Sequence, residues 1–241
     1  EFCVGVAMVE FDVIDLRDEC RDLLPAVYKD LLQVHFPVAD ELDDMEDIQE
    51  QLNTNDGRFP EGHVAVIRGK GDHQGVLMGC AVFEYYPQSN SALLSYICVA
   101  ARFRRLGLSK VLLKTTQEAV AQRAGGSVRA LYAETHRCDV EDGIMDPKER
   151  QQVLQGLGFR CLPLTYVQPP LSAHHQPCGG MWLLAWGPDP IPTAAVREFL
   201  HDFAGSMMDY DGSWKSQDYF QVMERELAEH EVLHGKAELY W

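Results

Sequence analysis

The sequence predicts an α/β (α+β) fold, in which helices flank a central, mixed and twisted sheet of about seven strands and a C-terminal helical extension follows. Three observations support this prediction. Strand-like and helix-like apolar patterns alternate along residues 4–186. A strand, a basic glycine-containing turn and a helix follow one another directly at residues 92–123. After Gly187 the composition changes, because three prolines precede two amphipathic helical patterns.

The length and composition are typical of a globular protein. The chain has 241 residues, of which 46% are hydrophobic and 24% are charged, and this suits one domain with an appendage. No apolar run approaches the ~18 residues of a membrane-spanning helix, and the N-terminal residues lack a signal-peptide pattern. Seven cysteines are scattered without Cys-x-x-Cys spacing. We therefore expect reduced, buried thiols and a cytoplasmic location.

The net charge of −16 restricts the partners. It argues against nucleic acid and against an anionic membrane surface, and it permits a cationic substrate, although solubility alone also explains it. The nine histidines include the adjacent pair His174 and His175. We expect no metal site.

In the first half of the chain, residues 4–14 read as a strand and residues 15–35 as a helix, in which Pro25 predicts a kink or a division into two shorter helices. Residues 40–52 read as a second, very acidic helix. Residues 63–68 and 75–86 form a predicted hairpin.

The second half continues with alternating elements. We expect strands at residues 92–99, 128–135, 159–167 and 180–186, with helices at residues 107–123 and 147–157. Gly158 fits a left-handed helix C-cap. The predicted division is 1–187 for the main domain and 188–241 for the extension. The extension contains two predicted helices, residues 193–208, with Thr193 as N-cap, and residues 216–234. We expect them to pack on their own domain, on a partner subunit or over the substrate cleft.

The turn at residues 100–109 predicts an anion site. Unpaired backbone N–H groups and the positive end of a helix dipole meet there, and phosphate is the usual ligand of such a site. Gly107 permits a close approach, and Arg104 and Arg105 add positive charge. The spacing matches neither a nucleoside-triphosphate loop nor a dinucleotide fingerprint.

The segment Arg104-x-x-Gly107-x-Ser109 resembles the pyrophosphate loop of the GNAT N-acetyltransferase superfamily, with Ser109 in place of the usual Gly or Ala. A second motif, Leu-Gly-Phe-Arg at residues 157–160, resembles the end of the helix that follows the family's fifth strand. The resemblance covers roughly residues 4–186 and implies the GNAT acyl-CoA N-acyltransferase fold with acetyl-CoA as co-substrate.

The resemblance also implies how acetyl-CoA is bound. Strands four and five should splay apart, and backbone groups of Ile97 and Val99 should bind the pantetheine arm as an added strand would. One of these N–H groups would polarise the thioester carbonyl. The pyrophosphate would lie on the loop formed by Arg104, Arg105, Leu106, Gly107, Leu108 and Ser109.

Two residues depart from the family's catalytic pattern. The usual fourth-strand Glu is Ser95 here, and the usual Tyr before the Gly-Phe pair is Leu154. We expect Glu134, at the end of the fifth strand, to be the base and Tyr166, in the sixth strand, to be the acid.

Other residues near these positions offer further candidates. Glu84 on the third strand is another candidate catalytic carboxylate. His136 lies close in sequence to Glu134, and Gln168 lies close to Tyr166. Each has a structural alternative: an exposed strand carboxylate for Glu84, a structural hydrogen bond for Glu134, a loop histidine for His136 and core packing for Tyr166.

The predicted function is an acetyl-CoA-dependent N-acetyltransferase that acts on a primary amine of a small molecule or an aminoacyl group. The alternative is a catalytically weak or inactive GNAT-fold module that binds acyl-CoA in a regulatory or assembly role. A longer acyl donor and a homodimer also remain open. The acidic residues 40–52 should lie beside the acceptor pocket and favour a cationic amine, and residues 36–42 and 166–169 should shape that pocket.

Overall fold

The computed structural model describes residues 9–38, 42–55, 57, 59–137, 145–170, 176–208 and 210–236. Its elements in chain order are β1 (Phe11–Asp15), η1 (Arg21–Leu23), α1 (Leu24–Val27), η2 (Tyr28–Leu32), α2 (Gln33–His35), α3 (Met45–Asn53), β2 (Glu61–Gly69), η4 (Gly71–His73), β3 (Leu77–Tyr86), β4 (Ser91–Val99), η5 (Ala101–Phe103), α4 (Leu108–Arg123), β5 (Leu131–His136), α5 (Pro147–Gly156), β6 (Arg160–Cys161), β7 (Met181–Trp186), β8 (Ile191–Pro192), α6 (Thr193–Met207), η6 (Ser213–Ser216), α7 (Asp218–Ala228) and β9 (Val232–Leu233).

A seven-stranded mixed sheet forms the centre of the molecule, as predicted, with the order β1-β2-β3-β4-β5-β7-β6. Strands β1 to β4 are antiparallel, β4 and β5 are parallel, and β7 is antiparallel to both of its neighbours. The single parallel pair requires a crossover connection, and α4 supplies it. Alternating side chains along each strand cover both faces of the sheet.

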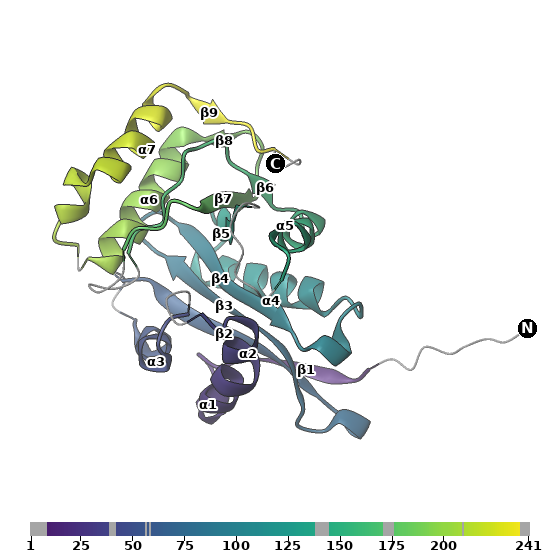
Figure 1. The fold of residues 1–241 in the computed structure, drawn as a ribbon. Helices are drawn as coiled ribbons and strands as arrows, with labels where there is room; N and C mark the ends of the chain where they lie inside the picture. The colour runs from purple at the N-terminus through teal and green to yellow at the C-terminus, as the bar shows by residue number, and fades with distance from the viewer. Residues whose placement is uncertain are drawn as a thin grey trace, which may run out of the picture.

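Helices cover both faces (Figure 1). On one face, α4 and α5 bury Leu112 and Leu154 against residues such as Phe83 and Leu94. On the other face, α1 to α3 cover the half of the sheet that contains β1 to β3. The C-terminal helix α6 covers the remaining half of that face, where Phe199 stacks on Tyr132 of β5 with ring centroids 4.0 Å apart.

The N-terminal helical region begins later than predicted. Asp15 ends β1, and its carboxylate is bonded to His63 and to the backbone N–H of Arg17, so it caps a turn and starts no helix. Cys20 has a left-handed backbone with φ 54°, which a helix interior excludes. Pro25 lies in the first turn of α1, where its missing N–H costs nothing, and it therefore starts this helix where a kink was predicted.

The predicted helix over residues 40–52 is also shorter, since α3 begins at Met45. Asp43 lies before the helix, where its backbone N–H donates to the hydroxyl of Tyr96 on β4. Its backbone C=O accepts from the hydroxyl of Tyr28. These contacts hold the residues before α3 against the sheet.

The strand predicted over residues 159–167 is wrong after Cys161. Pro163 has no N–H to donate, and the N–H of Leu164 turns back to the carbonyl of Leu162. Tyr166 therefore lies in a loop, and Gln168 forms an isolated bridge with Cys178. Gly158 has φ 96° just beyond α5, so the predicted left-handed cap is confirmed.

The C-terminal residues return to the sheet, and here two predictions are wrong. Thr193 is the first helical residue of α6, after the N-cap Pro192, and its hydroxyl donates to the carbonyl of His230. Because the chain must reach this contact and pair β9 with β8, α7 ends at Ala228 and does not continue to residue 234. A buried carboxylate, Asp202, fastens α6 to the β3–β4 turn by accepting from the N–H and hydroxyl of Ser89.

Candidate active site

The parallel strands β4 and β5 separate partway along their length. They pair only from Ala92 with Leu131 to Leu94 with Ala133. Beyond that point β4 continues to Val99, while Glu134 and the residues after it pair with β7 on the other side. Within the described residues, no strand occupies the place beside β4 after Leu94, so a gap opens in the sheet.

The edge of β4 along this gap presents backbone donors. The N–H of Ala100 donates to Met78 on β3, and backbone groups alternate in direction along a strand. The N–H groups of Ile97 and Val99 therefore point into the gap. The carbonyl of Val99 accepts a hydrogen bond of 3.3 Å from Nε of Arg104. An extended ligand chain with amide groups would find strand-like partners here.

A loop rich in free N–H groups follows β4. Gly107 has φ 78° and is the N-cap of α4, and Arg105 also has positive φ, at 65°. In the described part of the chain, the backbone N–H groups of residues 105–109 donate to no carbonyl or side chain. A Cβ at Gly107 would meet nothing within 4 Å, so the loop is open to an incoming anion. Free amides, a helix dipole and two arginines lie together here, and such a group suits an anion, whose binding stays a prediction.

Glu134 is the first residue of β5 beyond its pairing with β4, at the mouth of the gap. Its Oε1 accepts from the hydroxyl of Tyr166 and its Oε2 accepts from Nε2 of Gln168 at 2.9 Å. Burial raises the pKa of Glu134 to about 7, although both hydrogen bonds act in the opposite direction. A carboxyl of this kind exchanges a proton readily near neutral pH.

Glu84 lies two strands away on the same face of the sheet. It is 3% exposed, so the exposed strand carboxylate considered from the sequence is wrong. Its Oε2 accepts a 2.6 Å hydrogen bond from Ser95. Burial, with the charges of Asp43 and Glu134 as smaller contributions, raises the pKa of Glu84 to about 8.

A β-bulge puts two consecutive residues of β4, Ser95 and Tyr96, on this face. Val82 pairs with Tyr96 and Phe83 pairs with Leu94, so Ser95 has no partner on β3. Ser95 lies two residues after Leu93, the partner of Glu84, so its hydroxyl reaches Glu84. A polar row of Glu84, Ser95 and Glu134 thus crosses three neighbouring strands.

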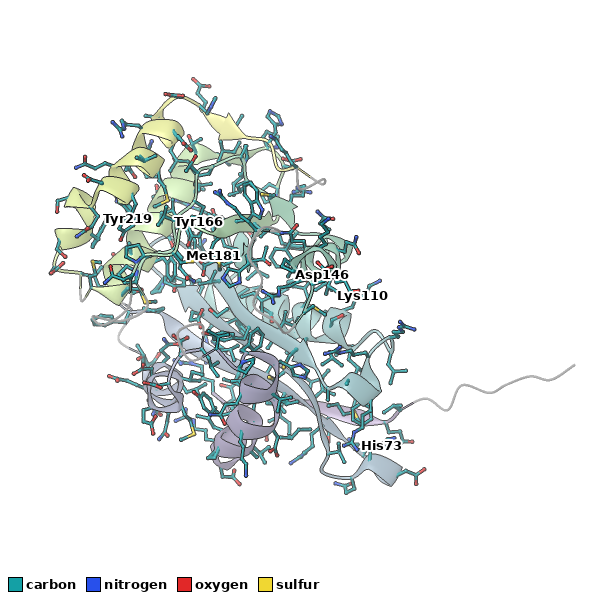
Figure 2. All side chains as sticks on the ribbon, in the orientation of Figure 1. His73, Lys110, Asp146, Tyr166, Met181 and Tyr219 are labelled. Carbon is teal, nitrogen blue, oxygen red and sulfur yellow. The ribbon has the colours of Figure 1, made fainter. Side chains whose placement is uncertain are left out.

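The row lies in a cavity of about 510 Å³ between the residues before α3 and helix α6. Its lining comprises Phe36, Val38, Asp43, Gln51, Glu84, Tyr86, Leu93, Ser95, Tyr96, Glu134, Thr135, His136, Arg150, Gln168, Pro169, Gln176, Cys178, Met181, Phe203 and Met207. Figure 2 labels Met181 of the lining and the completely buried Tyr166, which belong to one hydrophobic cluster between the sheet and the C-terminal helices.

The structure brings together most of the catalytic candidates. Glu84, Glu134 and His136 line the same cavity, and Tyr166 touches Glu134 from behind. His136 is 7% exposed and its Nδ1 lies 3.4 Å from Nη1 of Arg150, so it is held at the edge of the cavity. Leu154 packs in the hydrophobic cluster beneath α4 and α5, on the opposite face of the sheet.

Several lining residues escaped the sequence analysis. Gln51 lies within residues 40–52, which were predicted beside the acceptor pocket, but neither it nor Arg150 of α5 was singled out. Phe203 and Met207 belong to α6 of the C-terminal extension, for which packing over the substrate cleft was one of three predicted placements. Of the acidic residues before and within α3, Asp43 lines the cavity, and it precedes the helix.

The described residues contain neither a metal-binding cluster nor a membrane-spanning helix. In the described ranges, no three His, Cys, Asp or Glu side chains group closely enough to hold a metal ion. No helix of the described ranges is both long and apolar enough to cross a bilayer.

Comparison with known proteins assigns the family. Residues 24–141 match the model of the acetyltransferase (GNAT) family. The chain belongs to the GNAT family of acetyltransferases. This GNAT acetyltransferase contains the β4–β5 gap, the anion loop and Glu134 within the matched residues, and the family uses acetyl-CoA.

Solved structures with similar folds include the following three. The IAA acetyltransferase from Bacillus cereus is 18% identical, with 73% of this chain and 98% of that chain covered and a TM-score of 0.44. Ard1 from Thermoplasma volcanium is 15% identical, with 74% and 97% covered and a TM-score of 0.48. An acetyltransferase from Bacillus subtilis in complex with CoA is 15% identical, with 74% and 99% covered and a TM-score of 0.44. No curated protein matches the chain.

Proposed function

We propose that this GNAT acetyltransferase transfers an acetyl group from acetyl-CoA to a primary amine of a small molecule or an aminoacyl group. The position of Glu134 supports this proposal most directly. It places a carboxyl with a pKa of about 7 at the mouth of the β4–β5 gap, inside a cavity large enough for a small acceptor. An amine nucleophile needs such a group, because it must lose a proton to react.

The fit of the residues to acetyl-CoA rests on two features. The free N–H groups of residues 105–109, with Gly107 open to solvent, suit a pyrophosphate. The N–H groups of Ile97 and Val99 suit the amide chain of pantetheine, and one of them would polarise the thioester carbonyl. Acetyl-CoA, when bound, supplies the activated acetyl group.

Glu134 acts as the base in this proposal. Its deprotonated form accepts a proton from the ammonium of the acceptor, and the neutral amine then attacks the carbonyl carbon. The C–N bond forms and the C–S bond breaks. The proton held by Glu134 passes to the departing sulfur, and the restored carboxylate takes the second proton from the nitrogen as the amide forms and releases it to solvent.

Tyr166, the predicted acid, acts through Glu134. Its hydroxyl is completely buried and donates to Oε1 of that residue. Burial and the charge of Glu134 raise the pKa of Tyr166 well above its usual value, so the tyrosine keeps its own proton. In our proposal Tyr166 and Gln168 orient the carboxylate of Glu134, and Glu134 returns the proton to the sulfur. The acid role of Tyr166, the homodimer, the cytoplasmic location and the division at residue 187 stay predictions.

The test is acetyl-CoA-dependent release of free thiol across a panel of polyamines, aminoglycosides, amino acids and peptides. Glu134→Gln should keep acetyl-CoA affinity and lower turnover of an accepted amine by roughly 10²–10⁴. The loss should shrink as pH rises, because more of the free amine is then already neutral. Glu118→Gln, an exposed carboxyl on α4, is the matched control and should leave turnover unchanged.

Two outcomes would contradict the proposal. Acetyl-CoA binding without acetylation of any amine would favour the binding-module alternative. Wild-type turnover in Glu134→Gln from pH 6 to pH 10 would return Glu134 to a structural hydrogen-bonding role.

A further inference from the structure

Glu84 has no task in the proposed chemistry, although its burial is energetically costly. It faces the same cavity as Glu134 and lies on β3, with β4 between them. Neighbouring strands are about 4.8 Å apart, so the two backbones are about 10 Å apart. The cavity therefore contains two separate buried carboxyl groups, one at the gap and one remote from it.

The hydrogen-bonding groups around Glu84 are mostly acceptors. Ser95 occupies Oε2 of Glu84, and within the described part of the chain Oε1 accepts no side-chain hydrogen bond. Oε1 of Gln51, which also lines the cavity, is buried and has no hydrogen-bond partner among the described residues. Asp43 adds a second carboxylate, whose Oδ2 accepts from the hydroxyl of Tyr96. A ligand with several N–H donors and a positive charge would satisfy these groups.

The positive charge of the cavity lies elsewhere. Arg150 enters from α5 beside His136, at the far end of β5. Along the described lining, the Glu84 end contains Asp43 and Gln51 but no lysine or arginine. A cationic ligand group would therefore meet an electrostatic preference for this end over the His136 end.

Aromatic rings line the same cavity. Phe36 and Tyr96 meet edge to face with centroids 5.0 Å apart. Tyr86 and Phe203 meet in the same way at 6.1 Å. Rings in such positions cover an alkyl chain and also attract ammonium groups.

We propose that the acceptor is a diamine or oligoamine, in which an apolar spacer separates two protonatable nitrogens. This inference rests on the proposed function and specifies its substrate class. The reacting nitrogen lies at Glu134, loses one proton to that carboxyl before it attacks and a second as the amide forms, and gains the acetyl group. The second nitrogen stays protonated and binds Glu84, Asp43 and Gln51. Glu84 is thus a specificity-determining residue.

Steady-state kinetics with matched amines tests this proposal. The acceptors are 1,4-diaminobutane, 1,6-diaminohexane and spermidine, compared with n-butylamine and 6-aminohexanoate. We expect kcat/KM for the best diamine to exceed that for n-butylamine at least tenfold, and 6-aminohexanoate to be poor because a carboxylate would face Glu84. Glu84→Gln should lower kcat/KM for the diamine at least tenfold, mainly through KM, and should change the value for n-butylamine less than threefold.

Further variants separate binding from folding. Glu84→Asp keeps the charge on a shorter side chain and should retain the diamine preference with a longer optimal spacer. Acetyl-CoA affinity and the circular dichroism spectrum should be the same in both variants as in the wild type. Equal kcat/KM for n-butylamine and the diamines, or an unchanged preference in Glu84→Gln, would overturn the proposal.

Calorimetry separates failure of this inference from failure of the proposed function. If no amine is acetylated, the proposed function fails, and the binding of 1,4-diaminobutane then decides the inference. Tighter binding than n-butylamine, weakened at least tenfold in Glu84→Gln, supports it. Equal binding of the two amines overturns it.

Discussion

The two candidate binding regions of this acetyltransferase present opposite hydrogen-bonding groups and opposite charges. The loop at residues 104–109 presents backbone N–H groups at the exposed start of α4 and suits an anion. The cavity behind it presents the carboxyl groups of Asp43, Glu84 and Glu134 and suits a cation. One region donates hydrogen bonds and the other mainly accepts them.

The difference has an energetic consequence. Free amides at a helix start are solvated by water, so the loop costs little stability before its ligand arrives. Buried carboxyl groups lose their solvation, and their pKa values rise to about 8 for Glu84 and about 7 for Glu134. Burial of the ionised carboxyl groups therefore destabilises the folded protein until a cation binds, whereas the unoccupied loop destabilises it very little.

Gly107→Glu tests the loop most severely, and we expect CoA affinity to fall by at least 10³-fold, or about 4 kcal/mol. The substitution puts a side chain on a residue with φ 78° and a negative charge where a pyrophosphate would bind. Calorimetric titration with CoA measures the effect. Gly126→Glu is the matched control, because a Cβ there meets nothing within 4 Å and its φ lies outside the positive range. Unchanged affinity in folded Gly107→Glu would remove the loop from the binding site.

Glu84→Gln tests whether burial of this carboxyl destabilises the folded state, through the pH dependence of the free energy of unfolding. The unfolded carboxyl has a pKa of about 4.3, whereas the folded one is raised to about 8. Between these values the folded state keeps a proton that the unfolded state has lost, so the free energy of unfolding falls as pH rises. The amide does not titrate, so we expect the free energy of unfolding of Glu84→Gln to exceed that of the wild type by about 2–4 kcal/mol at pH 9 and to differ little from it at pH 4. Urea unfolding at both pH values is the measurement, and an equal effect at both would contradict burial of the charge.

Tyr166→Phe tests whether the tyrosine orients Glu134. Removal of the hydroxyl deletes a hydrogen bond that lowers the pKa of Glu134, so that pKa should rise. We expect turnover to fall by roughly 10–30-fold, about 1.5–2 kcal/mol, and the acidic limb of the kcat/KM profile to move to higher pH. A lower turnover with an unmoved limb would instead support the predicted acid role.

Arg104→Ala should have the smallest effect. The guanidinium is exposed and bonded to the carbonyl of Val99, so water screens much of its attraction for a pyrophosphate. We expect CoA affinity to fall about five- to tenfold, near 1 kcal/mol, with a weaker effect at high salt. A loss as large as that of Gly107→Glu would show that side-chain charge, and not the backbone, dominates the loop.

The loop could be predicted from the sequence because its function depends on residues that are adjacent in the chain. Arg104, Gly107 and Ser109 lie within one turn, and the glycine's backbone requirement is local. The order of strands and helices was predictable for the same reason, since each pattern is local. Element boundaries failed where distant contacts decide them, as at Asp15, which pairs with His63, and at Thr193, which bonds to His230.

The cavity could be predicted only in part, because it depends on register. Glu134 was expected at the gap from strand order alone. The contact between Glu84 and Ser95 depends on the register that pairs Glu84 with Leu93, and no local pattern fixes that register. Asp43 was expected within a helix, yet it lies before the helix, where its backbone N–H donates to Tyr96, and it lines the cavity.

The buried link between Asp202 and Ser89 has a consequence for how this enzyme could acquire new acceptors. It fixes the start of the next residue, Phe203, and thereby one wall of the cavity, from a helix outside the residues that match the family. Substitutions along α6 could resize the acceptor cavity while the loop and the β4 edge remain unchanged. The wall that α6 contributes to the cavity can therefore change independently of the β4 edge and the loop at residues 104–109.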